Sequence, residues 1–180
     1  MKKITLLLVL AIAFSCENKN KNKEEEKKDI LEEKVEEKKP EKFVIELTMR
    51  MDNSDGFRLF ANGVFINNNR TMNINITEQI SKSDNFETVT LDLPESIRPD
   101  YEVGIALGSK EEKTIEFQQA KISYGDIEFL VSPDKMEEYF YFSKDINYNA
   151  ENGTIKTQKV NGRHDPIMYL RKNVVDKFNL

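Results

Sequence analysis

Residues 43–51 read FVIELTMRM, an alternation of apolar and polar side chains. Phe43 and every second residue after it are apolar, whereas Glu46, Thr48 and Arg50 lie between them. Successive side chains of a strand point to opposite faces of a sheet. This period of two therefore predicts a half-buried strand with one face in a core.

Rows of the same kind recur along the rest of the chain, separated by turn residues. We expect strands at 57–60, 64–66, 72–76, 89–93, 101–107, 115–117, 122–124, 127–131, 139–142, 154–160 and 167–170. The pair Asn62-Gly63 predicts a tight hairpin. Residues 133–138 predict one helical turn, and no segment shows the pattern of an amphipathic helix. Short strands at this spacing predict an all-β fold, an antiparallel two-sheet β-sandwich of the jelly-roll kind over residues 43–180.

The first fifteen residues have the pattern of an export signal, with Lys2 and Lys3 before an apolar run from Ile4 to Phe14. That run is far shorter than the ~20 residues a membrane-spanning helix needs. Ser15-Cys16 follows it and resembles the cleavage site of bacterial lipoproteins. The resemblance implies a signal peptide over residues 1–15, lipid on Cys16 and a membrane anchor. A conventional secretory signal cut nearby is the alternative.

Residue 17 is Glu rather than the Asp that marks inner-membrane retention in enteric bacteria. The resemblance therefore implies an outer-membrane lipoprotein of the bacterial envelope, and it leaves open which face of the membrane carries the domain. Residues 17–42 are dominated by acidic and basic side chains, and their only apolar ones are Ile30, Leu31 and Val35. So few apolar side chains cannot offset the entropy of ordering the segment. Residues 16–42 are thus predicted to be a flexible charged tether.

Composition excludes several classes of function. The formal net charge is −5, and the folded part has no Lys/Arg cluster, which argues against a nucleic-acid partner. One cysteine permits no intramolecular disulfide. The sequence contains no phosphate-binding loop, dinucleotide fingerprint or zinc spacing, so we expect neither a cofactor nor a metal.

Residues 89–131 resemble the closing half of carbohydrate-binding-module-like jelly rolls. Leu93-Pro94, Ile97-Arg98, Gly104-Ile105 and Ile127-Glu128-Phe129 stand in the order typical of those modules. The resemblance implies glycan binding through aromatic platforms with amide partners. The candidate ligand-binding residues are Tyr101, Tyr139, Tyr141, Tyr148, Asn67 and Asn68. In alternating strands, however, a tyrosine is more often a core residue with its hydroxyl at the edge.

Three weaker signals have simpler explanations. His164 is the only histidine, and Asp165, as the next residue, is poorly placed to orient it, so a turn residue is the favoured interpretation. Asp126 and Glu128 share a strand face by period two, the arrangement a glycosidase needs, but acid pairs are common on solvated strands. Residues 52–56 read DNSDG, which offers oxygen ligands for calcium, but the segment lacks the terminal Glu of an EF-hand loop, and an Asx-type turn is the favoured interpretation.

The sequence thus favours a membrane-anchored, non-catalytic binding lipoprotein, with a glycan as the leading ligand. A structural or accessory envelope lipoprotein that docks a protein partner is the second hypothesis. An enzyme acting on polysaccharide through Asp126 and Glu128 is the third, and we do not expect it.

Overall fold

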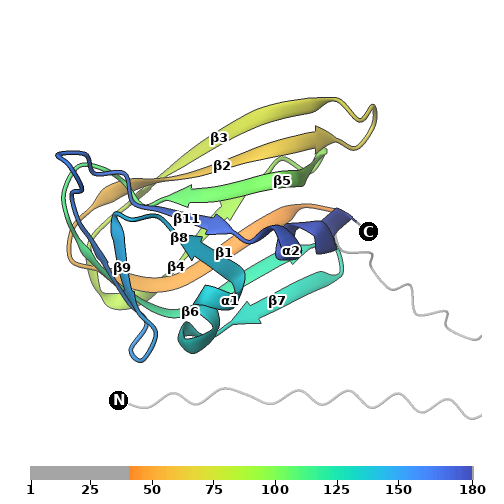
Figure 1. The fold of residues 1–180 in the computed structure, drawn as a ribbon. Helices are drawn as coiled ribbons and strands as arrows, with labels where there is room; N and C mark the ends of the chain where they lie inside the picture. Colours follow the sequence, from red (N-terminus) through yellow and green to blue (C-terminus); the bar gives the residue numbers. More distant parts are fainter. Residues whose placement is uncertain (1–40, 180) are drawn as a thin grey trace, which may run out of the picture. The chain divides into compact units, whose positions relative to one another are not determined.

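Two antiparallel sheets pack face to face in the computed structural model, which describes residues 41–179 (Figure 1). The predicted signal peptide, Cys16 and residues 17–40 of the predicted tether lie outside the described residues. No helix in residues 41–179 is long and apolar enough to cross a membrane.

The larger sheet has six strands in the order β4-β1-β6-β10-β9, with β7 also paired to β6. The smaller sheet has five strands in the order β3-β2-β5-β11-β8. The strands are β1 (Phe43–Met51), β2 (Asp55–Phe65), β3 (Thr71–Ile80), β4 (Ser83–Asp92), β5 (Ile97–Ala106), β6 (Thr114–Tyr124), β7 (Ile127–Val131), β8 (Phe140–Phe142), β9 (Ile146–Asn149), β10 (Thr154–Thr157) and β11 (Ile167–Leu170). The predicted all-β, two-sheet sandwich is confirmed.

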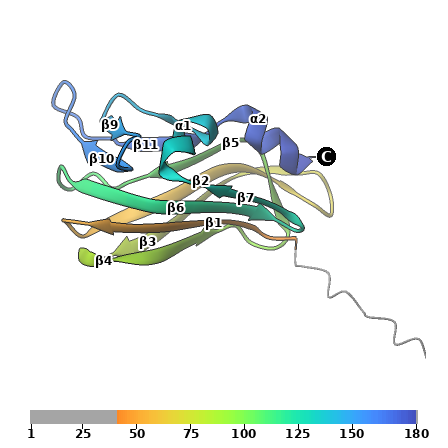
Figure 2. The same cartoon turned by 90° about the horizontal axis from the view of Figure 1, so that it is seen from below.

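The strand β1 shows why the sandwich forms. Its five odd-numbered residues are buried and its even-numbered residues are half-buried, so one face enters the core. β1 lies between β4 and β6, and Figure 2 shows it running alongside β6. The inward-facing side chains of both sheets pack together in one hydrophobic core. Its largest fully buried side chains include Phe43, Phe57, Phe140, Phe178, Ile45, Leu47 and Leu59. Each such side chain contributes roughly 1.5–3 kcal/mol.

The predicted hairpin at Asn62-Gly63 is wrong. β2 runs without a break through both residues, and the chain turns at residues 66–70, where Asn69 has a φ of +54°. Gly63 serves close packing instead, because a Cβ there would lie 2.5 Å from Ile97 Cγ2. The tight Asn-Gly turn occurs at Asn161-Gly162, where both φ angles are positive.

Other elements differ from the sequence prediction in detail. The predicted strands 115–117 and 122–124 are one strand, β6, whose register on β1 shifts between Thr48 and Met49. The short strand β9 was not predicted. Helical turns follow Pro133 as expected, in η1 (Pro133–Lys135) and α1 (Met136–Tyr139). Two unpredicted turns, α2 (Lys172–Val175) and η2 (Asp176–Asn179), end the chain and bury Val174, Val175 and Phe178. Elements of four residues are too short to show a helical period.

A buried ion pair joins the start of β2 to the loop between β5 and β6. Lys113 Nζ, fully buried, donates to Asp55 Oδ2 at 2.5 Å and to the Leu107 carbonyl at 3.0 Å. The backbone N–H groups of Gly56 and Lys110 also donate to the Asp55 carboxylate. Burial alone would raise the pKa of Asp55, but the hydrogen bond from Lys113 and those from the backbone outweigh it and lower this pKa. Through these three donors Asp55 fixes the start of β2 against the β5–β6 loop. Within residues 41–179, no group of acidic side chains is arranged to hold a metal.

Replacing Lys113 tests how much this ion pair contributes to the free energy of unfolding. We expect Lys113→Met to lower the free energy of unfolding by roughly 3–5 kcal/mol, because it leaves the Asp55 carboxylate buried without its counter-ion. Urea unfolding followed by circular dichroism measures the loss. Lys42→Met is the matched control, since Lys42 pairs with Asp92 at the surface, and it should leave the urea midpoint nearly unchanged.

The double variant Asp55→Asn with Lys113→Met should recover part of the lost free energy of unfolding, because neither charge is then buried alone.

The lowered pKa of Asp55 also determines how the stability of the protein depends on pH. Its contribution to stability is complete above the ordinary aspartate pKa of ~3.9 and disappears as the pH falls through the lowered value. A Lys113→Met protein as stable as the Lys42→Met control at pH 7 would contradict this account.

Candidate ligand-binding face

The four predicted tyrosines lie in two different environments. Tyr101 and Tyr141 are each 58% exposed. Tyr139 is half-buried, with its ring 5.8 Å from that of Phe129. Tyr148 packs its ring 4.8 Å from that of Phe142 and donates its hydroxyl to the Pro133 carbonyl at 2.5 Å. Tyr139 and Tyr148 therefore act in packing, as the alternative interpretation of the tyrosines expected.

Burial also affects the chemistry of Tyr148. It raises the pKa of this phenol to about 12, with smaller contributions from the Glu137 and Asp134 carboxylates. The hydroxyl therefore remains protonated at neutral pH and keeps its hydrogen bond to Pro133. A phenol engaged in this way holds η1 against β9 rather than presenting a free donor to a ligand.

Asn67 and Asn68 lie in the exposed loop between β2 and β3. The Asn68 side-chain oxygen accepts the backbone N–H of Arg70 at 3.0 Å, which stabilises the turn. Asn67 is exposed at the tip. Neither residue lines the pocket described below.

Cross-strand register gathers aromatic side chains on the outer face of the five-stranded sheet. Phe60 of β2 lies opposite Gly104 of β5, Gly104 lies opposite Tyr169 of β11, and Tyr169 lies opposite Tyr141 of β8. The ring centroids of Phe60 and Tyr169 are 5.8 Å apart, and those of Tyr169 and Tyr141 are 6.2 Å apart. We call Phe60, Tyr169 and Tyr141 the aromatic row.

Gly104 makes room for this row. A Cβ at that position would lie 2.2 Å from Cζ of Phe60, so the Phe60 ring extends over the glycine. The ring then meets Tyr169 edge-on, at an interplanar angle of 81°. Edge-to-face contacts of this kind are favourable for aromatic pairs. The row is therefore held by packing before any ligand arrives.

Polar side chains lie beside Phe60, at one end of the row, in a shallow pocket of about 300 Å³ that neither Tyr169 nor Tyr141 lines. It is lined by Phe60 together with Arg58, Ala61, Asn62, Asn73, Ile74, Asn75, Glu102 and Ile167. The Arg58 guanidinium lies 5.7 Å from the centre of the Phe60 ring, and no carboxylate within residues 41–179 forms an ion pair with it. The side-chain amide of Asn62 donates to Asn73 at 2.6 Å.

The electrostatics of the row favour hydrogen bonding rather than acid–base chemistry. Burial raises the pKa of Tyr169, and the nearby Glu102 and Asp165 carboxylates raise it further. The phenol is therefore neutral at physiological pH and can donate or accept a hydrogen bond. The pocket thus offers an aromatic surface with amide, guanidinium and carboxylate groups at its border, which is the lining typical of sites that bind polar ligands.

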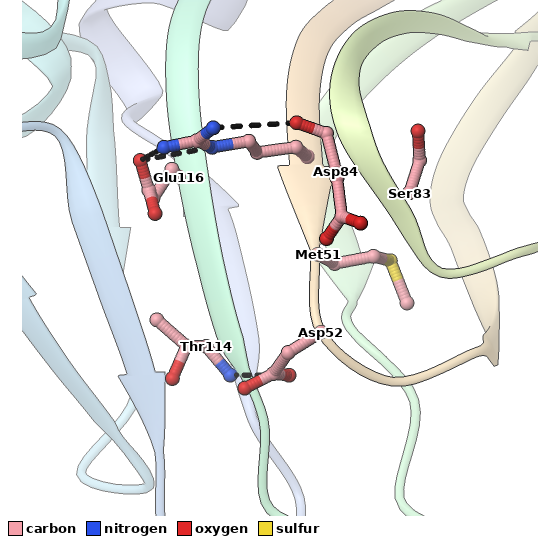
Figure 3. Close-up of a pocket in the computed structure, with 7 residues that line it drawn as sticks. Met51, Asp52, Ser83, Asp84, Thr114 and Glu116 are labelled. Atoms are coloured by element: carbon pink, nitrogen blue, oxygen red, sulfur yellow. Dashed lines mark hydrogen bonds and ion pairs between the residues drawn. The ribbon is translucent and has the colours of Figure 1, made fainter.

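A second pocket, of about 440 Å³, lies over the six-stranded sheet and is lined by Arg50, Met51, Asp52, Ser83, Asp84, Thr114 and Glu116 (Figure 3). Arg50 donates from Nε and Nη2 to Glu116 Oε2, at 3.1 and 2.7 Å, and from Nη1 to the Asp84 carbonyl. Asp52 accepts the Thr114 backbone N–H. The Arg50 guanidinium also lies 5.1 Å from the centre of the exposed Phe86 ring. Because this cation is already paired with Glu116, whereas Arg58 has no ion-pair partner within residues 41–179, the pocket is the weaker candidate.

The structure separates the two acidic residues considered for catalysis. Asp126 belongs to the two-residue turn between β6 and β7, so the prediction that it shares a strand face with Glu128 is wrong. Glu128 forms an ion pair with Lys121 at 3.5 Å. His164 is buried, and neither of its ring nitrogens has a hydrogen-bond partner in the described part of the chain. The favoured interpretation made it a turn residue, but it follows the Asn161-Gly162 turn and is buried.

Comparison with known families, curated proteins and solved structures found no significant match. Sequence reasoning identified Tyr141 but missed Phe60, Tyr169 and Arg58. One signal was present: a glycine inside a predicted strand often marks the close approach of another group, and Gly104 is such a glycine.

Substitution of Gly104 tests the packing of the row. We expect Gly104→Ala to lower the free energy of unfolding by about 1–3 kcal/mol, because the new methyl group displaces the Phe60 ring. In a protein that already carries Phe60→Ala, Gly104→Ala should lower the free energy of unfolding by less than it does in the wild type, since no ring then opposes the new methyl group. Urea midpoints of the two single variants and the double variant give the coupling. Simple additivity would show that the ring does not extend over Gly104.

Proposed function

We propose that this protein is a membrane-anchored, non-catalytic binding lipoprotein whose aromatic row binds a glycan. The supporting observation is the alignment of Phe60, Tyr169 and Tyr141 beside a pocket lined by amide and charged side chains. The resemblance of residues 89–131 to carbohydrate-binding modules points to the same ligand class, and so does the shallow, open form of the face.

The chemistry of the face suits a sugar. A pyranose ring has an apolar face of C–H groups that packs on aromatic rings, and hydroxyl groups around its edge. The aromatic row supplies the apolar surface, and Asn62, Asn75 and Arg58 supply donors and acceptors beside it. Arg58 and Glu102 carry opposite charges at one pocket, which favours a ligand that is largely neutral.

The predicted anchor would place this face at the bacterial envelope. Lipid on Cys16 holds the chain at the outer membrane, and the charged segment 17–42 separates the anchor from the sandwich. Several acyl chains are needed for stable anchoring, since each buried methylene contributes ~0.8 kcal/mol and a single chain binds only marginally. A tethered binding domain of this kind would hold cell-envelope polysaccharide close to the membrane.

Two equally exposed tyrosines provide a matched test of the binding face. Tyr141 belongs to the aromatic row, whereas Tyr101, also 58% exposed, contributes neither to the row nor to the pocket. For a glycan identified on an array, we expect Tyr141→Ala to weaken binding roughly tenfold, the effect of losing a contact worth ~1.4 kcal/mol. Tyr101→Ala should bind as the wild type does.

Titration calorimetry with the full chain in detergent measures both affinities. Circular dichroism verifies that each variant is folded. Equal affinity of the Tyr141→Ala and Tyr101→Ala proteins would remove the aromatic row from the binding site. The absence of any ligand among cell-envelope polysaccharides would contradict the proposed ligand class itself.

The anchor has a separate test. Cys16→Ala removes the only thiol in the chain, so the protein made in a bacterial host should no longer incorporate labelled palmitate and should leave the membrane fraction. Mass spectrometry of the wild-type amino terminus should show a diacylglyceryl group on Cys16. An unmodified cysteine, or a wild-type chain that fractionates like the variant, would contradict the lipoprotein proposal. It would leave the proposed glycan site unaffected.

A further inference from the structure

The free edge of β3 is the least protected strand edge in the described structure. β3 lies at the end of the five-stranded sheet and pairs only with β2, in ten consecutive positions without a bulge (Figure 1). Between Thr71 and Thr77 it has no charged residue and no proline. Natural edge strands normally carry charges, prolines or bulges that prevent pairing with another chain.

The other long edge strand, β4, has the features that prevent pairing with another chain. β4, at the end of the six-stranded sheet, carries Asp84, Glu87 and Asp92, and its register on β1 shifts between Met49 and Met51. The other strands with a free edge, β7, β8 and β9, have only five, three and four residues. β3 is therefore the one long and regular edge within residues 41–179 that lacks these features.

The backbone of β3 is oriented for pairing at alternate residues. The Phe65 N–H donates to the Arg70 carbonyl at 3.0 Å, which makes these two residues a hydrogen-bonded pair of the β2–β3 ladder. Hydrogen-bonded and non-bonded pairs alternate along an antiparallel ladder. The even-numbered residues of β3 therefore bond to β2. The N–H and C=O groups of Thr71, Asn73, Asn75 and Thr77 point to the free edge.

The sequence of this edge is nearly palindromic. Residues 70–78 read RTMNINITE, and Ile74 is the centre of symmetry. Antiparallel pairing of two copies about Ile74 places Asn73 opposite Asn75 and Thr71 opposite Thr77, and both pairs use the backbone groups at the free edge. Met72 then meets Ile76 on the core side of the sheet. Like side chains thus face each other on each face.

Charge complementarity supports the same register. Arg70 at one end of the edge falls opposite Glu78 of the second copy, and the two-fold axis repeats the pair. Both residues are exposed, and neither forms an ion pair within residues 41–179. Met72 and Ile76 are only partly buried in one copy, so the second copy would also cover apolar surface.

We infer that the protein forms a two-fold symmetric dimer in which β3 pairs antiparallel with β3 of a second copy, centred on Ile74. The occupant is a second copy rather than an unrelated peptide, because the near-palindrome and the reciprocal Arg70–Glu78 contacts match this edge to itself. The dimer joins the two five-stranded sheets into one. It places Asn73 and Asn75 of both copies, with their pockets, on a continuous outer face. This inference stands apart from the proposed glycan binding.

Disulfide trapping tests the register directly. In the inferred dimer, Thr71 and Thr77 of opposite copies form a hydrogen-bonded pair with Cα atoms ~5.5 Å apart, within the range that a disulfide spans. Two copies of Thr77 lie six positions apart along the strands, roughly 20 Å, and so do two copies of Thr71. Both threonines are exposed and lie outside the pocket.

The experiment mixes full-length Thr71→Cys protein with full-length Thr77→Cys protein in detergent under mild oxidation. We expect a disulfide-linked dimer in the mixture and none from either variant alone, or from the wild type, which controls for Cys16. A mixture that yields no more linked dimer than the single variants would overturn the inferred pairing. Circular dichroism shows that each variant remains folded.

Charge reversal supplies a second measurement. In the same mixture, adding Glu78→Arg to both proteins should reduce trapping several-fold, because two arginines then meet at each end of the edge. Adding Arg70→Glu as well should restore trapping, since it re-forms both pairs with the charges exchanged. If Glu78→Arg leaves the yield of disulfide-linked dimer unchanged, or if adding Arg70→Glu does not restore that yield, the proposed register is contradicted. Changes in glycan affinity play no part in either readout.

Discussion

Burial of alternate side chains along the inner strands β1, β2 and β6 holds the two sheets together. In β1 the odd-numbered residues fill the space between the sheets, and rows from β2, β5 and β6 meet them there. Because the core takes only the inward residues, the outward residues are free to serve other purposes. On the six-stranded sheet they form surface ion pairs, such as those of Lys121 with Glu46 and Glu128. On the five-stranded sheet they form the aromatic row, which the core does not need.

Local alternation was enough to predict the fold class, because it depends on residues one and two apart. It failed where the same local signal has two outcomes. The chain contains three Asn-Gly pairs, at residues 62, 152 and 161. It turns at Asn152-Gly153 and at Asn161-Gly162, but β2 runs straight through Asn62-Gly63. At Gly63 the packing of Ile97 and Ile74 from neighbouring strands explains the glycine, and those contacts cannot be read from adjacent residues.

The candidate site was predictable only in part for the same reason. Tyr141 could be named as an exposed aromatic, but its partners come from β2 and β11, and only the pairing register brings them together. The buried pair of Asp55 with Lys113 shows the same dependence on tertiary context. In the sequence, Asp55 belonged to an acidic turn that also offered oxygen ligands for calcium. In the structure its carboxylate is satisfied by a lysine from a distant loop, which fixes the β5–β6 connection against β2.

We propose that the outer face of the five-stranded sheet binds the ligand. The most direct measurement of that claim is the nuclear magnetic resonance spectrum of the full chain in detergent, labelled at its aromatic rings, during titration with a cell-envelope oligosaccharide. The account predicts that ring signals of Phe60, Tyr169 and Tyr141 shift together at one saturation point, while those of the packed Tyr148 stay in place. Shifts confined to Phe86, whose ring lies beside the Arg50 pocket, would contradict it.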